Sequence, residues 1–561
     1  MPFPTTGAAT VRTPGLRGAV AVIMSDCLKD LARHGRPIAA LVLAAFLLAG
    51  GALPGKAAES ALTPQEERGK RIYQEGRGSE DAAIVALVGR SRTRVDAGVL
   101  PCAGCHGADG LGRPEGGAEP SNVTWSELAK SYGHRHASGR SHPAFDEQSF
   151  AGAVADGVDP AGNDLEPVMP KYEMSAEDIV ALVAYVKRLE TDLDPGLTEA
   201  SITVGTVLPR AGSYGPRGQA VEAVFRAYFE EINATGGVFG RKLELEVAEY
   251  LPDPEATLAN ARRLIEGERI FAALGVFAIG QEQPLFTLLD EDNIPQVGPF
   301  TLLAGHEGLP GRSAYFLESG LALQASALAD HAAGNLGLSP SGVAVLITAN
   351  EVFDDIARAV EARSRAHGWP RPLIVRQPDN GARARGLVGQ LAREGVDTVF
   401  HFASARDLAA FAAEAARQDW RPSLFLSGLI AGEASFDLPP AVAGRTYVAY
   451  PSLPSDSTPE GRAEFEALHR KHGLSRQHVA VQAAAYAAAK VFVEGLRRAG
   501  RSISRAALVA ALEGLSGFET GLTPPVSLGL ERHVGVRGAH VLTVDPAARG
   551  FSPETTWVAV E

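Results

Sequence analysis

Two cysteines and a histidine lie close together in the run C-A-G-C-H, which places Cys102, Cys105 and His106 within five residues. Two thiols at this spacing can reach the two vinyl groups of one porphyrin, and the histidine that follows can bind the iron as an axial ligand. The same cysteines would also suit a redox pair or half of a zinc site. His106 directly after Cys105 argues against the redox pair, and the chain has no second C-x-x-C to complete a zinc site. The motif therefore predicts one covalently attached haem c.

Helices are expected on both sides of this haem motif (residues 102–106). Residues 66–73 have helical character, and residues 175–189 form a stronger helix that begins after Ser175 as N-cap. Its apolar residues repeat on one face: Ile179, Leu182, Val183, Val186 and Leu189. An insert at residues 79–99 carries three arginines, which we interpret as a solvated face rather than a docking site: Arg90, Arg92 and Arg94.

The whole region from about residue 62 to residue 192 resembles a class I cytochrome c domain. The resemblance rests on Gly69 and Tyr73, the haem motif, the segments G-V-D-P-A-G (157–162) and P-V-M-P-K-Y (167–172), and the closing helix. It implies a small all-α domain that carries single electrons between redox partners, such as a dehydrogenase and a terminal oxidase chain.

The same resemblance implies that Met169, in the loop before the closing helix, is the second axial ligand of the iron. A thioether favours ferrous iron and raises the reduction potential. Met174 is an alternative, as are three histidines of a polar loop: His134, His136 and His142. If one of these histidines binds the iron, the potential falls.

The N-terminal region indicates export. Residues 37–53 are almost unbroken apolar sequence, basic residues precede them, and small residues follow at 55–58, so residues 1–58 are interpreted as a leader with a signal peptide. The apolar run is shorter than the roughly 18 residues of a membrane-spanning helix, which makes an uncleaved anchor the less favoured interpretation. Haem c is attached outside the cytoplasm in bacteria, which agrees with a periplasmic location. Because Cys27 lies in the leader, the exported chain keeps only the two cysteines of the haem motif.

The charge of the chain is acidic. The formal net charge is -13, and it becomes -17 when residues 1–58 are left out. This balance argues against nucleic acid or an anionic membrane surface as a partner.

From residue 201 onward, short apolar runs alternate with amphipathic helices. Strands are expected at 202–208, 243–248, 272–276, 342–347, 398–402 and 423–426, and helices at 218–234 and after Asp253 and Pro254. Repeated βα units predict parallel sheets covered on both faces. Residues 193–200 form a linker. We expect one lobe from 201–318 and 455–525, and a second from 319–454 and 526–561.

Three segments resemble the leucine/isoleucine/valine-type periplasmic binding proteins of type I fold. They are I-T-V-G (202–205), E-E-I-N-A-T-G-G-V-F-G-R-K-L (230–243) and Asp253-Pro254. The similarity extends over about residues 200–550. It implies a two-lobed α/β domain that closes on a small ligand by hinge motion and offers the closed form to an ABC permease or a sensor. The predicted fold is therefore multidomain, with a small all-α cytochrome c domain before this two-lobed domain.

Amino-acid binders of this family hold the ligand carboxylate with hydroxyl and backbone N–H groups of two first-lobe loops, and the ammonium with a second-lobe acid. Here Ile279 and Leu302 stand where the hydroxyls align, and Leu429 stands where the acid is usual. A buried charge without a partner costs several kcal/mol. The sequence therefore argues against a free amino acid as the ligand.

The remaining candidates for the ligand pocket are more apolar. Arg217, in the first βα loop, could bind an organic acid as a bidentate pair, or could simply be an exposed loop arginine. The candidate pocket residues are Arg217, Phe277, Ala278, Phe300, Thr301, Phe353 and Ser404.

Nothing in the sequence predicts hydrolytic or transfer catalysis, since no Ser/His/Asp set, phosphate loop or H-E-x-x-H pattern occurs. We therefore expect an electron carrier fused to a binding protein for a small organic molecule, serving a periplasmic dehydrogenase, and not an enzyme by itself. Two alternatives stay open. The chain could be a transport or sensor receptor whose haem is a redox tag, or a subunit of a haem or dehydrogenase enzyme.

Overall fold

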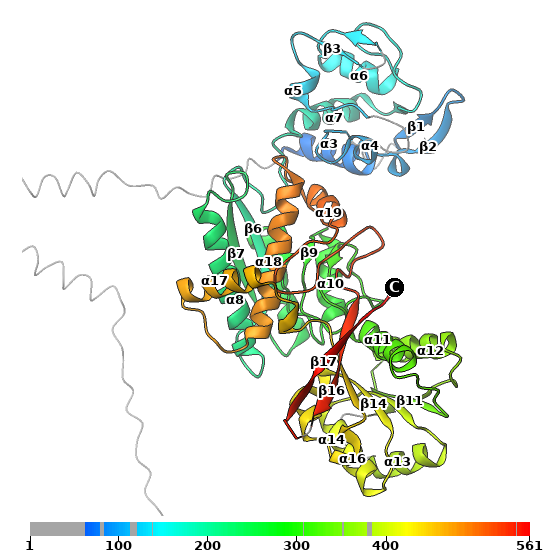
Figure 1. Ribbon diagram of the computed structural model, residues 1–561. Coiled ribbons are helices and arrows are strands. Elements are labelled where there is room, and N and C mark those ends of the chain that lie inside the picture. The colour runs from blue at the N-terminus through cyan, green and yellow to red at the C-terminus, as the bar shows by residue number, and fades with distance from the viewer. Residues whose placement is uncertain are drawn as a thin grey trace, which may run out of the picture. The chain divides into compact units, whose positions relative to one another are not determined.

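A computed structural model describes residues 62–78, 83–112, 120–136, 139–306, 308–350, 353–377, 384–545 and 547–561. The predicted leader, residues 1–58, lies outside the described residues, as does part of the insert before the haem motif. Figure 1 shows the course of the chain.

The cytochrome region is mainly helical. Its helices are α3 (Pro64–Glu75), α4 (Cys102–His106), α5 (Trp125–Leu128), α6 (Glu147–Ala155) and α7 (Ala176–Arg188), with the 3-10 turn η1 (Ala97–Val99). The side chain of Ser175 accepts the N–H of Asp178, so the predicted N-cap of α7 is present. Leu182, Val183 and Val186 are buried, whereas Ile179 is only half-buried.

A small sheet interrupts this helical region. Strands β1 (Val85–Val88) and β2 (Thr93–Asp96) form a hairpin, and β1 also pairs antiparallel with β5 (Lys171–Glu173). A second, very short pair consists of β3 (His134–Arg135) and β4 (Ser141–His142). The expectation of an all-α domain therefore omitted these strands. The insert is a β-hairpin, and its Arg90, Arg92 and Arg94 are exposed.

Helices α3 and α7 cross at very short range through Gly69. A Cβ atom at Gly69 would lie 2.0 Å from the carbonyl oxygen of Ala181, so no larger residue fits without movement. Nearby, Arg68 forms an ion pair with the fully buried carboxylate of Asp178. The glycine allows the contact and the ion pair strengthens it.

The first lobe of the binding domain has a parallel sheet in the order β10-β9-β8-β6-β7. Its strands are β6 (Ser201–Pro209), β7 (Lys242–Tyr250), β8 (Ala272–Leu274), β9 (Gln296–Val297) and β10 (Ala314–Tyr315). The helices are α8 (Gly215–Ala234), α9 (Pro254–Glu268), α10 (Glu282–Glu291), α17 (Pro459–His472), α18 (Val479–Ala499) and α19 (Arg505–Glu513). The C-terminal helices, orange in Figure 1, return to the sheet of this lobe.

The second lobe has one larger mixed sheet, in the order β12-β11-β13-β14-β15-β16-β17. Its parallel strands are β11 (Val343–Thr348), β12 (Leu373–Gln377), β13 (Thr398–Phe402), β14 (Ser423–Ser427) and β15 (Thr446–Tyr450). Strands β16 (Gly538–Asp545) and β17 (Gly550–Ala559) are antiparallel and extend its edge, in red in Figure 1. The helices are α11 (Leu321–Gly334), α12 (Asp354–Ala366), α13 (Ala384–Arg393), α14 (Ala405–Arg417), α15 (Gly428–Ala431) and α16 (Pro440–Ala443), with the 3-10 turns η3 (Gly432–Asp437) and η4 (Pro454–Asp456).

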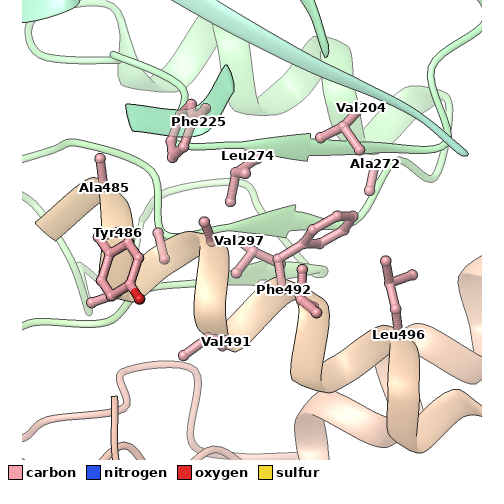
Figure 2. Packing of buried hydrophobic residues seen from close by; sticks show 14 of the residues in the cluster. Val204, Phe225, Ala272, Leu274, Val297, Ala485, Tyr486, Val491, Phe492 and Leu496 are labelled. Carbon is pink, nitrogen blue, oxygen red and sulfur yellow. The ribbon is translucent and has the colours of Figure 1, made fainter. Parts of the chain in front are cut away.

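Helix α18 supplies much of the first-lobe core. Its buried Tyr486, Phe492 and Leu496 pack in the same cluster as Leu274 and Val297 of the sheet, as Figure 2 shows. Among the described residues, α18 is the helix long and apolar enough to cross a membrane, but 61% of its apolar window is buried inside the molecule. We therefore interpret α18 as a core helix.

Two lobe boundaries differ from the predicted ones. Leu197 of the predicted linker is fully buried in the first-lobe core, so the packed part of this lobe begins before residue 201. Val526, Leu528 and Val536 also belong to that core, although the segment from 526 was expected in the second lobe. The chain enters the second-lobe sheet only at β16. Both segments are rich in turns and lack a periodic pattern, so their sequence does not indicate which lobe they pack against. This explains why both boundaries differ from the predicted ones.

Candidate functional site

The haem motif forms the short helix α4, with Pro101 in extended conformation before it and Gly107 after it at a φ of 78°. Both cysteines are free thiols, Cys105 exposed and Cys102 half-buried. His106 is buried, and its Nδ1 atom lies 2.8 Å from the carbonyl oxygen of Ser121. This contact fixes the tautomer and leaves Nε2 with a lone pair.

Two buried tyrosines hold the backbone on either side of the motif. The hydroxyl of Tyr73 donates to the carbonyl of Gly107 at 2.8 Å, and that of Tyr172 donates to the carbonyl of Leu100 at 2.7 Å. Burial raises the pKa of both phenols, so they remain donors at neutral pH. Free thiols beside an imidazole with a fixed tautomer are the donor set that haem c requires, so the residues present fit that group.

Met169 lies in the loop that leads into β5. Its N–H donates to the carbonyl of Glu166 at 2.9 Å, its side chain is half-buried, and buried Pro170 follows it. Met174, the alternative ligand, is also half-buried. The choice between them remains a prediction.

The three alternative histidines contact one another. The Nε2 atoms of His136 and His142 are 2.9 Å apart, and the ring centroids of His134 and His142 are 5.0 Å apart. His142 is buried, and its Nδ1 lies 2.8 Å from the carbonyl oxygen of Pro143. Their mutual contacts give these histidines a packing role that needs no iron.

In the binding domain, two loops of the first lobe meet after β8 and β9. The N–H of Ala278 donates to the carbonyl of Phe300 at 3.0 Å, and Phe277 and Phe300 form an isolated parallel bridge. Phe277 is buried, with its ring 4.9 Å from that of Tyr250 and 5.1 Å from that of Tyr214. The structure thus brings together four predicted pocket residues: Phe277, Ala278, Phe300 and Thr301.

A buried acid beside these loops was missed by the sequence analysis. Glu282 accepts the hydroxyl of Thr301 at 3.0 Å and the N–H of Gly280 at 2.8 Å, and only 7% of its surface is exposed. Burial raises the pKa of its carboxyl group. The signal that could have found Glu282 is an acid two residues after Gly280, in the first turn of α10.

Arg217 does not lie in a loop as expected. It belongs to the first turn of α8, is exposed, and donates to the carbonyl of Ser213 at 3.3 Å. Its guanidinium lies 5.9 Å from the ring centroid of Tyr214. Proline at the second position of the helix and a turn at Tyr214 start α8 earlier than periodicity predicts.

The second-lobe candidates have local structural roles. Ser404 caps α14, accepting the N–H of Asp407 and donating to its carboxylate at 2.8 Å. Phe353 packs against the second-lobe core at the start of α12. Leu429, in α15, is 44% exposed. Among the described residues, no hydrogen bond, ion pair or ring contact joins Phe353, Ser404 or Leu429 to Phe277, Ala278, Phe300 or Thr301.

Residues 201–550 match the model of the periplasmic binding protein family, and residues 95–190 match that of cytochrome c. The chain belongs to the periplasmic binding protein family. Its N-terminal part is a cytochrome c domain, which implies covalent haem c, so the predicted fusion is confirmed.

Two relatives carry Leu/Ile/Val-binding names. Leu/Ile/Val-binding protein homolog 8 of Brucella abortus (strain 2308) is 24% identical over 333 residues, which cover 56% of this chain and 81% of the relative. BraC3 of Rhizobium johnstonii is 29% identical over 103 residues, 18% of this chain and 28% of the relative. Membership of this family implies a periplasmic or extracellular location and a small ligand.

Solved structures confirm the type I fold of the binding domain. A branched chain amino acid ABC transporter protein from Thermus thermophilus with bound valine gives a TM-score of 0.52 at 17% identity, covering 65% of this chain and 98% of that one. A fatty acid ABC transporter substrate-binding protein from Thermomonospora curvata gives 0.51 at 17% identity, covering 66% and 94%. These two proteins are named for different ligands, so this fold alone does not define a ligand.

Proposed function

We propose that the chain is a periplasmic electron carrier that also captures a small organic molecule, other than a free amino acid, for a periplasmic dehydrogenase. Cys102 and Cys105 attach one haem c, and His106 and Met169 bind its iron. When bound, the haem supplies a one-electron redox couple. The contact between His106 and Ser121 is the observation that supports this proposal best, because a fixed neutral imidazole is what an axial ligand needs.

The protein's own residues would keep the haem site in place. Tyr73 and Tyr172 hold the backbone on both sides of α4, and Asp178 with Arg68 ties the closing helix to the first one. Cytochrome c and periplasmic binding domains are non-catalytic in general, and the proposal needs no catalytic residue.

Haem attachment is tested on protein expressed with a cytochrome c maturation system. Denatured protein should keep its haem through the thioether bonds, and the double variant Cys102→Ala, Cys105→Ala should lose it. A wild-type protein that is colourless after denaturation would contradict the proposal.

Service to a dehydrogenase is tested separately, by rapid mixing of the oxidised protein with reduced periplasmic dehydrogenases. Ligands come from a thermal-shift screen of amino acids, organic acids, alcohols, amines and aromatics. We expect the ligand that stabilises the protein to be a substrate or product of the dehydrogenase that reduces the haem. The coupling would be rejected if the ligand did not change the rate of haem reduction and if no dehydrogenase reduced the haem.

A second candidate function is reception for an ABC permease or a sensor, with the haem as a redox tag. The observation that favours it is the family membership of residues 201–550, because such domains deliver ligands to membrane proteins. Transport of the ligand in cells that make wild-type protein, but not in cells without it, would support this function. The leader at residues 1–58 and the uncleaved-anchor alternative are tested by the N-terminal sequence of the exported protein.

A further inference from the structure

The carboxyl ends of four neighbouring strands meet at one edge of the first-lobe sheet. Tyr214 follows β6, Tyr250 ends β7, Phe277 follows β8, and Thr301 follows β9. In open α/β sheets, ligands bind outside the carboxyl ends of the strands. The chemistry of these side chains therefore decides which ligand this lobe accepts.

Flat apolar surface dominates one part of this edge. The ring of Phe277 contacts the rings of Tyr214 and Tyr250, at centroid distances of 5.1 and 4.9 Å. The hydroxyl of Tyr250 donates to the carbonyl of Ile279, so its polar end is already satisfied. Tyr214 is 41% exposed, so part of its ring can contact a ligand, although the guanidinium of Arg217 lies 5.9 Å from the ring centroid.

Hydrogen-bond acceptors dominate the other part. Both carboxylate oxygens of Glu282 are turned toward the two loops, where they accept from Thr301 and Gly280. In the part of the chain that the structure describes, Glu282 has no lysine, arginine or histidine within ion-pair distance. The neighbouring residue Gln281 is only 4% exposed, and its buried side-chain carbonyl accepts no hydrogen bond from the described residues. A buried acceptor without a donor is costly, and a ligand with an N–H or O–H group would relieve that cost.

Glu282 also sets the polarity of Thr301. Because the Thr301 hydroxyl donates its only proton to Glu282, the oxygen can only accept further bonds. It already accepts the N–H of Leu303 at 3.0 Å, and one lone pair remains. A ligand carboxylate would meet lone pairs here instead of hydroxyl protons, with a buried acid behind them.

We propose that this edge binds a hydrogen-bond donor, a hydroxyl or ammonium group, carried on a flat apolar body, and that it rejects carboxylates. The donor group faces Thr301 and Gln281, Glu282 sets the acceptor character of Thr301, and the apolar body lies on Tyr214 and Phe277. The inference rests on the proposed function, since it names the ligand class of the binding domain. It also replaces the organic acid that Arg217 suggested.

The test uses three probes with one ring and different head groups: benzylamine, benzyl alcohol and benzoate. Their affinities for the full-length holoprotein are measured by isothermal titration calorimetry at neutral pH. We expect benzylamine and benzyl alcohol to bind and benzoate not to bind at about millimolar concentration. Benzoate binding as tightly as benzylamine would overturn the inference, and so would a lack of binding by both donor probes.

Variants then show whether Glu282 sets this preference. Glu282→Gln should weaken the binding of benzylamine by about tenfold or more, because the negative charge is lost. Thr301→Val, which removes the accepting hydroxyl, should weaken both donor probes. The control Glu291→Gln removes an exposed acid at the other end of the same helix and should leave affinities unchanged. Equal effects of Glu282→Gln and Glu291→Gln would overturn the role of Glu282, provided that both variants melt at the wild-type temperature.

The outcomes separate this inference from the proposed function. If carboxylates bind and donors do not, the solute-binding function stands and only the ligand class is wrong. If no compound of the wider thermal-shift screen binds either, the solute-binding function itself fails.

Discussion

The Nδ1 atom of His106 lies 2.8 Å from the carbonyl oxygen of Ser121, so the proton of this imidazole is held by the backbone. A hydrogen bond of this kind orients a metal-binding imidazole and raises its basicity. Burial lowers the pKa of His106, which keeps the ring neutral and its Nε2 lone pair free. His106 would therefore offer an oriented, neutral Nε2 to the haem iron that we propose.

Met169→Ala should remove the weak absorption band that a bond from methionine sulfur to ferric iron gives at the red end of the visible spectrum. The reduction potential should fall, because a thioether favours ferrous iron. Both changes are measured on the purified holoprotein by spectroscopy and redox titration. Met174→Ala is the matched control and should keep the band. A band that persists in Met169→Ala would exclude Met169 as the ligand and direct attention to Met174.

Gly69→Ala should destabilise the cytochrome domain, because the new methyl group would lie 2.0 Å from the carbonyl oxygen of Ala181. Overpacking of this kind costs about 1–3 kcal/mol. The measurement is the thermal midpoint followed by haem absorbance. Gly152→Ala in α6 is the control, since its Cβ would meet nothing closer than 4.0 Å and alanine favours helices. Equal midpoints for both variants would show that α3 and α7 do not cross as closely as described.

Local chemistry made much of this molecule predictable. The Ser175 cap of α7 and the strand at 398–402 depend on neighbouring residues, and the structure has both features where the sequence places them. The hairpin β1–β2 and the strands β16 and β17 were missed. Strand β1 is stabilised by pairing with β5, which follows it by more than 80 residues, and such distant pairing leaves no periodic signal.

The candidate ligand site was predicted only in part, because some of its residues are brought together by a local rule and others by distant contacts. In open α/β sheets, the residues that follow the carboxyl ends of neighbouring strands lie together. This rule applies to four predicted residues: Phe277, Ala278, Phe300 and Thr301. Glu282 was missed because an acid in the first turn of a helix is an ordinary surface feature. Its burial arises from the loop of Thr301, which belongs to another βα unit and covers it only in the folded chain.

His401 should make the second lobe less stable in mild acid. It is fully buried in β13, and burial lowers its pKa to about 4. Between the unfolded pKa of about 6.5 and pH 4, only the unfolded chain binds the proton, so stability falls as pH decreases through this window. The loss is on the order of 3 kcal/mol at pH 4 and does not grow below it.

The measurement is urea unfolding at several pH values, followed by tryptophan fluorescence, since three of the four tryptophans lie in the second lobe: Trp369, Trp420 and Trp557. His401→Phe should flatten the dependence between pH 6.5 and pH 4. An unchanged slope in His401→Phe would assign the acid sensitivity to other groups.

Arg505 should be important for the stability of the first lobe. The guanidinium of Arg505 donates to three backbone carbonyls at 2.7 to 3.0 Å, those of Ile270, Phe271 and Asp292. The backbone N–H of Arg505 donates to the carboxylate of Asp194. Burial lowers the pKa of Arg505, but arginine stays charged at neutral pH. Lysine at this position keeps the charge but cannot reach three acceptors in one plane.

Arg505→Lys should therefore lower the free energy of unfolding of the first lobe by about 2–4 kcal/mol, through carbonyls left without donors. Limited proteolysis and hydrogen exchange of the segments around Ile270 and Asp292 measure this, because those backbone groups lose their partner. Arg501→Ala, at an exposed position just before α19, is the control and should exchange like wild type. If Arg505→Lys protects these segments as well as wild type does, the charge of the side chain rather than its planar geometry holds the lobe.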